Sequence, residues 1–201
     1  MASGITKEQA MKEVTDAGFP PLAAWDLMTP AMISLFVKKE VVMRGALDYI
    51  TPMELQVIYT AVSATNNCEL CLSFHAMGLK GGESISDEDL AILVSGGVPQ
   101  TESLLNGKGR LKSMAIAAKY AIAHKGILLP RERKHLAQLG FTEPRELTEI
   151  IFCAGHIYAN NLVMVSLIEQ GMPVAKMFRS AGPFAATSEG GEAAGWWIED
   201  A

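Results

Sequence analysis

Two cysteines and a histidine, Cys68, Cys71 and His75, stand at spacings that a helix places on one face. Residues three apart in a helix have Cα atoms about 5 Å apart, from a rise of about 1.5 Å and a turn of about 100° per residue. That separation is compatible with a disulfide, and His75 follows Cys71 by one further turn. A disulfide that closes so short a loop removes little chain entropy. We therefore interpret the pair as a reversible redox couple rather than a structural cross-link.

Other interpretations of these residues exist. Free cysteines are commonly buried as small apolar side chains, and a histidine on a helix face can simply be a satisfied polar residue. A helix N-terminus, however, lowers a thiol pKa, and a histidine at this spacing suits a base or proton relay. Zinc bound by Cys68, Cys71, His75 and His156 is disfavoured, because a second ligand pair at regular spacing is missing. We predict no bound metal.

Composition limits the classes of function. The chain has 201 residues, of which 49% are hydrophobic and 19% charged, with a net charge of −5. The charge argues against a nucleic-acid surface, and the apolar excess suggests an oligomer. Three cysteines suit a reducing compartment, and the first residues lack the pattern of a signal peptide. The apolar segment 150–168 contains His156, Asn160 and Asn161, so we expect no membrane span and a cytoplasmic protein.

Helix start and stop signals recur along the chain, and alternating strand patterns are nearly absent. The prediction is an all-α helical bundle with the Cys-x-x-Cys pair at the N-terminus of a central helix. We expect an N-terminal helical extension over residues 1–50, a core over 51–175 and a flexible tail over 176–201 that contains Trp196 and Trp197. The helices are predicted over residues 6–18, 30–45, 52–64, 66–81, 86–95, 111–124, 130–139 and 144–170.

The segments Thr51–Gln56 and Ala61–His75 carry a resemblance to a known family. A Cys-x-x-Cys-x-x-x-His motif follows a helix rich in Ala, Val and Ser that ends in Asn. This resembles the alkyl hydroperoxidase D (AhpD)-like branch of the carboxymuconolactone decarboxylase family. A weaker likeness continues to about residue 170. The resemblance implies an all-α fold, a homo-oligomer, often a trimer or hexamer, and peroxidase or disulfide reductase chemistry.

By analogy with that family, Cys71 attacks the peroxide. Cys68, nearer the helix start, is expected to be the more exposed cysteine, to resolve the sulfenate and to exchange with the reductant. The family usually places a Glu twelve residues before the first motif cysteine, where it relays protons to the histidine. Gln56 holds that position here, and an amide does not titrate. Some relatives also have a His directly before the second cysteine, where this chain has Leu70.

Three further residues lie near the motif in the sequence or one helix before it. Glu54 lies about 200° around the helix from Gln56, and we expect it to pair with Thr51 in a capping box. Glu69 is expected to be a first-turn residue favoured by the helix dipole, although it could replace the relay acid. Tyr59 could line the pocket, but core packing is favoured.

On the C-terminal helix, Cys153, His156 and Asn160 recur at roughly helical spacing. We favour a core-facing stripe with polar partners over a site role for them.

The leading hypothesis is a thiol-dependent, peroxiredoxin-like antioxidant oxidoreductase that reduces a hydroperoxide or a partner's disulfide. Cys68 and Cys71 would cycle between dithiol and disulfide, with His75 as proton relay. No bound cofactor is implied, and the electrons would come from an external dithiol or reductase partner. One alternative is a carboxymuconolactone-type decarboxylase, although such members generally do not depend on a cysteine pair. Another is a non-enzymatic oligomer that senses redox state.

Overall fold

The computed structural model describes residues 4–19, 24–81, 85–100, 102, 104–105 and 109–169. The expected tail over 176–201, with Trp196 and Trp197, lies outside the described residues, as does the last part of the expected core.

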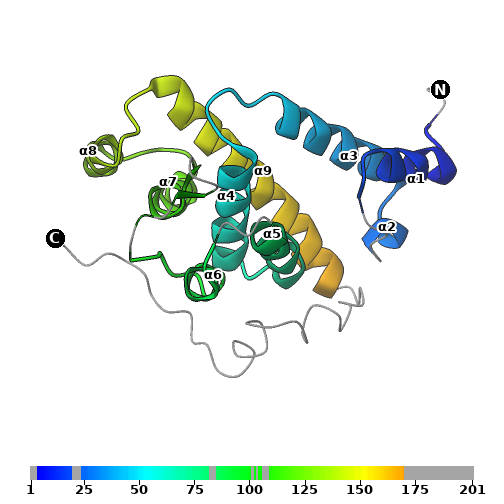
Figure 1. Cartoon of the computed structure of the whole chain (residues 1–201). Coiled ribbons are helices and arrows are strands. Elements are labelled where there is room, and N and C mark those ends of the chain that lie inside the picture. The colour runs from blue at the N-terminus through cyan, green and yellow to red at the C-terminus, as the bar shows by residue number, and fades with distance from the viewer. Residues whose placement is uncertain are drawn as a thin grey trace.

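The described chain is built almost entirely of helices, so the all-α prediction is confirmed (Figure 1). The helices are α1 (Lys7–Asp16), α2 (Ala24–Leu27), α3 (Pro30–Gly45), α4 (Pro52–Thr65), α5 (Glu69–Gly81), α6 (Asp87–Val94), α7 (Lys112–Ala123), α8 (Pro130–Gln138) and α9 (Pro144–Glu169). The sequence did not predict α2. Two short strands, β1 (Leu104–Leu105) and β2 (Gly109–Arg110), pair antiparallel where a loop was expected.

Side-chain caps fix where four of these helices begin. Thr6, Thr29, Thr51 and Ser86 each accept a hydrogen bond from a backbone N–H in the first turn of the helix that follows. These N–H groups have no partner within the helix, so each cap satisfies a donor that burial would otherwise penalise. The capping box predicted at α4 is present, and α1 begins with another, formed by Thr6 and Gln9.

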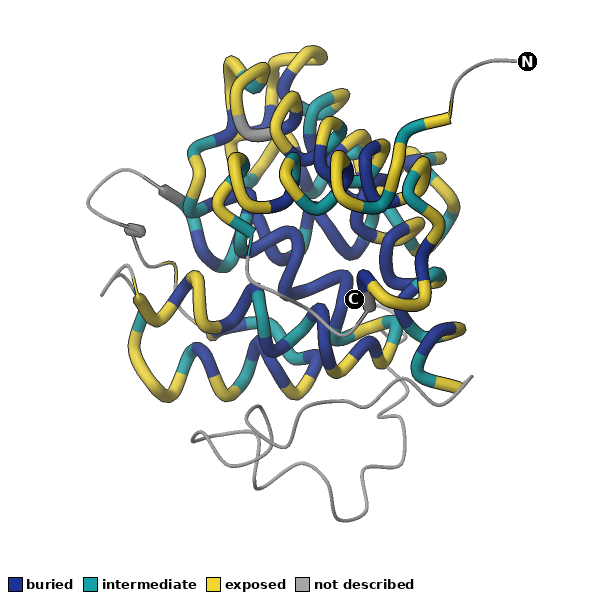
Figure 2. The backbone as a smooth tube through the Cα atoms, turned by 90° about the vertical axis from the view of Figure 1, so that its right-hand side faces the viewer, coloured by how far each residue is buried: buried dark blue, intermediate teal, exposed yellow. Residues whose placement is uncertain are grey.

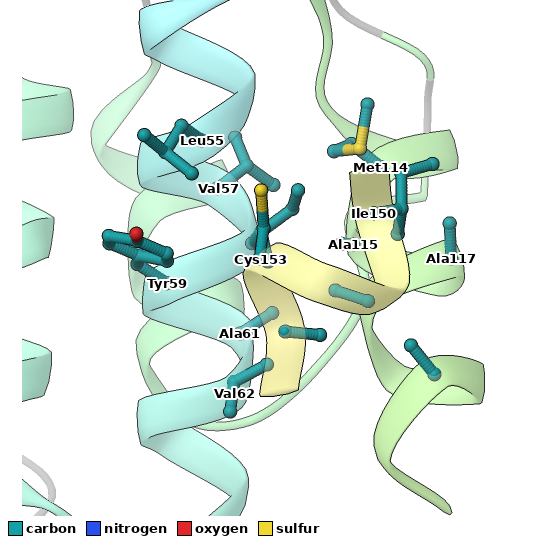
Figure 3. Close-up of a cluster of buried hydrophobic side chains, with 14 of the residues drawn as sticks. Leu55, Val57, Tyr59, Ala61, Val62, Met114, Ala115, Ala117, Ile150 and Cys153 are labelled. Atoms are coloured by element: carbon teal, nitrogen blue, oxygen red, sulfur yellow. The ribbon is translucent and has the colours of Figure 1, made fainter. Parts of the chain in front are cut away.

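The larger apolar cluster surrounds α4, with α7 and α9 on one side of it. Leu55, Val57, Met114, Ile150 and Cys153 belong to this cluster, and Figure 3 shows Cys153 of α9 facing α4. α5, α6 and α8 contribute further buried side chains. This cluster is the core of the segment predicted to fold as a unit from residue 51.

A second apolar cluster joins the N-terminal helices to the rest of the chain. Ala10, Trp25, Ile33 and Val37 of α1–α3 share it with Met164 near the end of α9. In Figure 1, α9 runs past α4, and its C-terminal end lies on the side of α2 and α3. Buried residues line the inner faces of the helices in Figure 2, and exposed residues mark the outer faces. The N-terminal extension therefore packs on the start of α5 and the end of α9.

α9 is the longest helix, and its most apolar window has a mean hydropathy of 1.5. By length and composition alone it could cross a membrane, although the sequence prediction treated its polar residues as interruptions. The core helix of a soluble protein passes the same test. Here α9 packs against α4 and α7, and it buries the side chains of His156, Asn160 and Asn161.

Candidate redox site

A tight connection between α4 and α5 places the two motif cysteines. Asn66 caps the end of α4, and Asn67 adopts a left-handed conformation with φ 53°, which Asn tolerates better than most residues. The Cys68 N–H then donates to the Ser63 carbonyl at 3.1 Å, and the Cys68 carbonyl accepts from the Leu72 N–H at 2.8 Å. Cys68 thus directly precedes α5, which begins at Glu69, three residues later than the helix start predicted at 66.

Cys68 and Cys71 are joined as a disulfide, with their Cα atoms 5.4 Å apart. This separation agrees with the value expected from helical spacing and lies within the range that disulfides occupy. The geometric part of the sequence prediction, that the two thiols can bridge without moving a helix, is confirmed.

The prediction that Cys68 is the more exposed cysteine is wrong. Cys68 is fully buried, whereas Cys71 is 7% exposed. Both belong to the second apolar cluster, together with Trp25 and Ile33 of the N-terminal helices. A helix start is often exposed in an isolated hairpin, but here the N-terminal extension covers it. Cys71 is therefore the sulfur that lies closer to solvent.

His75 lies one turn beyond Cys71 and is almost buried. Its Nδ1 lies 3.0 Å from the amide oxygen Oε1 of Gln56. An amide oxygen only accepts, so Nδ1 carries the proton in this pair and Nε2 can accept one in the neutral ring. Gly78 leaves room for the amide, because a Cβ there would lie 3.2 Å from Gln56 Oε1. The position expected to hold a relay carboxylate thus does contact the histidine, through an amide.

Glu54 forms its hydrogen bonds with residues other than His75. Its Oε2 accepts from the Thr51 N–H at 3.0 Å, which completes the predicted capping box. Its Oε1 accepts from Arg110 Nε at 2.9 Å, and Arg110 also pairs with Glu146. The structure therefore gives Glu54 a structural role and does not bring it to His75. Glu69 is exposed on the first turn of α5, as expected of a residue favoured by the helix dipole.

A small pocket opens beside Cys71 and His75. Its volume is about 50 Å³, enough for a few water-sized groups. Its wall is mostly aromatic and aliphatic, and three polar side chains, Glu40, His75 and Asn160, reach it together with Cys71. The apolar lining consists of Phe19, Phe36, Leu70, Phe74, Ile157 and Met164. Of the two disulfide sulfurs, only that of Cys71 belongs to a residue lining this pocket.

A buried polar group borders the same pocket. His156 of α9 forms a hydrogen bond through Nε2 with Oε1 of Glu40 on α3. Asn160 donates from Nδ2 to the same Glu40 oxygen at 3.1 Å. No pattern in the sequence pointed to Glu40, although it is the only acidic residue in α3. His156 and Asn160 are buried with polar partners, as predicted for a core-facing stripe, and Asn160 also lines the pocket.

Tyr59 connects the two histidines. Its ring packs edge-on against His75, with centroids 4.8 Å apart, and stacks on His156 at 5.8 Å. Figure 3 shows Tyr59 on the side of α4 opposite Met114 and Ile150. Tyr59 is buried and does not line the pocket, so the favoured prediction of core packing is correct.

Cys153 has a different environment from the motif cysteines. It is a fully buried free thiol in the larger cluster. Burial, reinforced by the charges of Glu149 and Glu40, raises the pKa of Cys153 to about 12. It therefore stays a thiol at neutral pH. Among the described residues, no group of three or more His, Cys, Asp or Glu side chains is arranged to hold a metal ion.

Comparison of the chain with protein-family models, with curated proteins and with solved structures gave no match. The resemblance noted above therefore rests on the motif and its spacing.

Proposed function

We propose that this chain is a thiol-dependent hydroperoxide or disulfide reductase of the AhpD-like kind. The observation that carries the proposal is the Cys68–Cys71 disulfide at a pocket that Cys71 and His75 line together. A disulfide between residues three apart adds little stability, so its value lies in being formed and broken. No metal or organic cofactor is needed for this cycle.

In the proposed cycle, the Cys71 thiolate attacks the hydroperoxide, and the Cys68 thiol then displaces the resulting hydroxide to form the disulfide. Cys71 is the better attacking residue because it lines the pocket, whereas Cys68 is buried behind it. The same burial changes the expected reductive step. An external dithiol that enters through the pocket meets Cys71 first, rather than Cys68. His75 accepts the Cys71 proton through Nε2, while Gln56 orients the ring.

The test uses the reduced full-length protein and cumene hydroperoxide. We expect two thiols to be lost for each hydroperoxide converted to its alcohol, with mass spectrometry locating the new bond at Cys68 and Cys71. Cys71→Ser should abolish turnover, and Cys153→Ser serves as the matched control that retains it. If the reduced protein keeps its thiols, or forms only intermolecular or over-oxidised cysteines, the proposed function is wrong.

The proposal includes a homo-oligomer, a trimer or hexamer. Large apolar side chains are exposed on two helices: Leu35, Val41 and Val42 on α3, and Phe152, Tyr158 and Leu162 on α9. Large apolar side chains exposed in such number on two helices support an interface with other copies of the chain. Light scattering at micromolar concentration should give a multiple of the monomer mass, and a monomeric mass would contradict this part of the proposal.

A further inference from the structure

Glu40 is a carboxylate in an apolar setting. Its side chain is almost fully buried, and it reaches the pocket from α3, outside the segment that carries the redox motif. Burying a charged group is costly unless it is hydrogen-bonded. His156 and Asn160, one turn apart on α9, both bond to its Oε1. The structure therefore holds a carboxylate at the pocket, hydrogen-bonded to two side chains of α9.

The proposed chemistry requires a group that can exchange a proton at this pocket. When the O–O bond of a hydroperoxide breaks, the departing alkoxide is strongly basic and leaves more easily if it is protonated. Gln56, at the position expected for a relay acid, has no proton to exchange at neutral pH. Glu54 is held by Thr51 and Arg110. Glu40 is the carboxylate that shares the pocket with Cys71 and His75.

We propose that Glu40, positioned by His156 and Asn160, is the proton-exchanging carboxylate of this pocket and protonates the leaving alkoxide. The inference rests on the proposed hydroperoxide reductase function. It assigns a catalytic residue to the N-terminal extension, so the site is completed only when that extension packs on α9. His156 and Asn160 act through Glu40 and are positioning residues.

His75 takes the proton of the Cys71 thiol and passes it to Glu40, which lines the same pocket, and the sulfur attacks the terminal oxygen of R–O–O–H. An S–O bond forms, the O–O bond breaks, and the alkoxide takes the proton from Glu40 and leaves as the alcohol. The Cys68 thiol then attacks the sulfenic sulfur, an S–S bond forms, and hydroxide leaves as water with the Cys68 proton. An external dithiol later returns two electrons and two protons.

Two oxidants whose leaving groups differ in basicity distinguish a catalytic role of Glu40 from a structural role. tert-Butyl hydroperoxide releases a strongly basic alkoxide, whereas peracetic acid releases a weakly basic carboxylate that needs no proton. General acid catalysis is worth roughly 10²–10⁴-fold. We therefore expect Glu40→Gln to slow single-turnover oxidation of the reduced protein by tert-butyl hydroperoxide by about 10²-fold, and to leave oxidation by peracetic acid nearly unchanged.

Two further variants complete the experiment. Glu54→Gln is the matched control, because it changes another buried glutamate with structural partners, and it should slow neither reaction. If Glu40→Gln does not fold, Asn160→Ala keeps the carboxylate but removes one of its two partners, and should give the same selective loss on a smaller scale. An equal slowing of both reactions, or of neither, would overturn the inference while leaving the proposed function standing. A wild-type protein that loses no thiols to either oxidant would instead overturn the proposed function itself.

Discussion

The two apolar clusters of this molecule differ in what they bury. The larger cluster, around α4, α7 and α9, holds the lone thiol Cys153 among aliphatic side chains. The second cluster, between the N-terminal extension, the start of α5 and the end of α9, holds Cys68 and Cys71 and borders the pocket that Glu40 reaches. Both clusters bury cysteine fully or nearly so. Burial alone therefore does not distinguish a redox site. What distinguishes Cys68 and Cys71 is that each lies next to a second thiol, close to a pocket and to groups that can exchange a proton.

The two clusters also differ in which parts of the chain form them. The larger cluster is assembled from elements within residues 43–157, and most of its members are fully buried. The second cluster joins segments from both ends of the described chain. The redox pair lies where these segments meet, so changes to the N-terminal helices should alter its reactivity without touching the larger cluster.

The largest expected difference is in thiol reactivity. With its pKa raised to about 12, Cys153 should present about a thousandfold less thiolate at pH 8 than an ordinary thiol. In the reduced native protein, iodoacetamide should therefore label Cys71 first and leave Cys153 unlabelled until the protein unfolds. Peptide mapping over time measures this order. If Cys153 is labelled as fast as Cys71, the thiols of the two clusters do not differ in reactivity and this prediction is wrong.

Trp25→Ala tests the cover over the redox pair. Trp25 is buried in the second cluster and packs edge-on against Phe36, with ring centroids 5.4 Å apart. Removing so large a side chain should cost about 3–5 kcal/mol of unfolding free energy, measured by denaturant titration. Since Cys68 lies under this cluster, reduction of the disulfide by dithiothreitol should also become faster.

The matched control for Trp25→Ala is Ile58→Ala, in the larger cluster. It should lower the unfolding free energy by about 2–5 kcal/mol and leave the rate of disulfide reduction unchanged under native conditions. If both variants accelerate reduction equally, the N-terminal helices do not control access to the pair.

Gln56→Glu should raise the rate of hydroperoxide reduction. A carboxylate at Nδ1 of His75 would favour the protonated ring and hold its orientation, and we expect a gain of about 10- to 100-fold in kcat/KM. Steady-state assays with cumene hydroperoxide measure it. Glu54→Gln should instead lower the melting temperature through the lost cap and ion pair, with almost no change in rate. If Glu54→Gln abolishes turnover and Gln56→Glu has no effect, the assignment of this helix face is wrong.

The smallest expected effect is that of the disulfide on global stability. The bond spans a separation of only three residues, so its loop-closure contribution should be at most about 2 kcal/mol. Urea unfolding of the oxidised and reduced proteins should give free energies within that range and nearly identical far-UV circular dichroism. A much larger loss of unfolding free energy on reduction would mean that the disulfide stabilises the packing of the N-terminal extension on the core.

Local signals in the sequence predict most of the helix starts. Threonine and serine caps mark the starts of α1, α3, α4 and α6, because a helix N-terminus needs those acceptors wherever it lies, and proline occupies the first helical position of α3 and α4. The spacing of Cys68, Cys71 and His75 likewise fixed their shared face, since it depends only on helix geometry. The capping role of Glu54 follows from the same kind of local signal. The contact of Gln56 with the histidine was expected from the family resemblance, and it depends on the packing of α4 against α5.

What surrounds that face depends on how the helices pack together. The burial of Cys68 depends on α1–α3 folding back over the start of α5. The hydrogen bond between Glu40 and His156 joins residues 116 positions apart in the sequence. No periodicity along the chain records such a contact, because the packing of α3 on α9 sets it rather than the period of either helix. The sequence therefore could not predict which carboxylate lines the pocket, because that depends on the packing of α3 against α9.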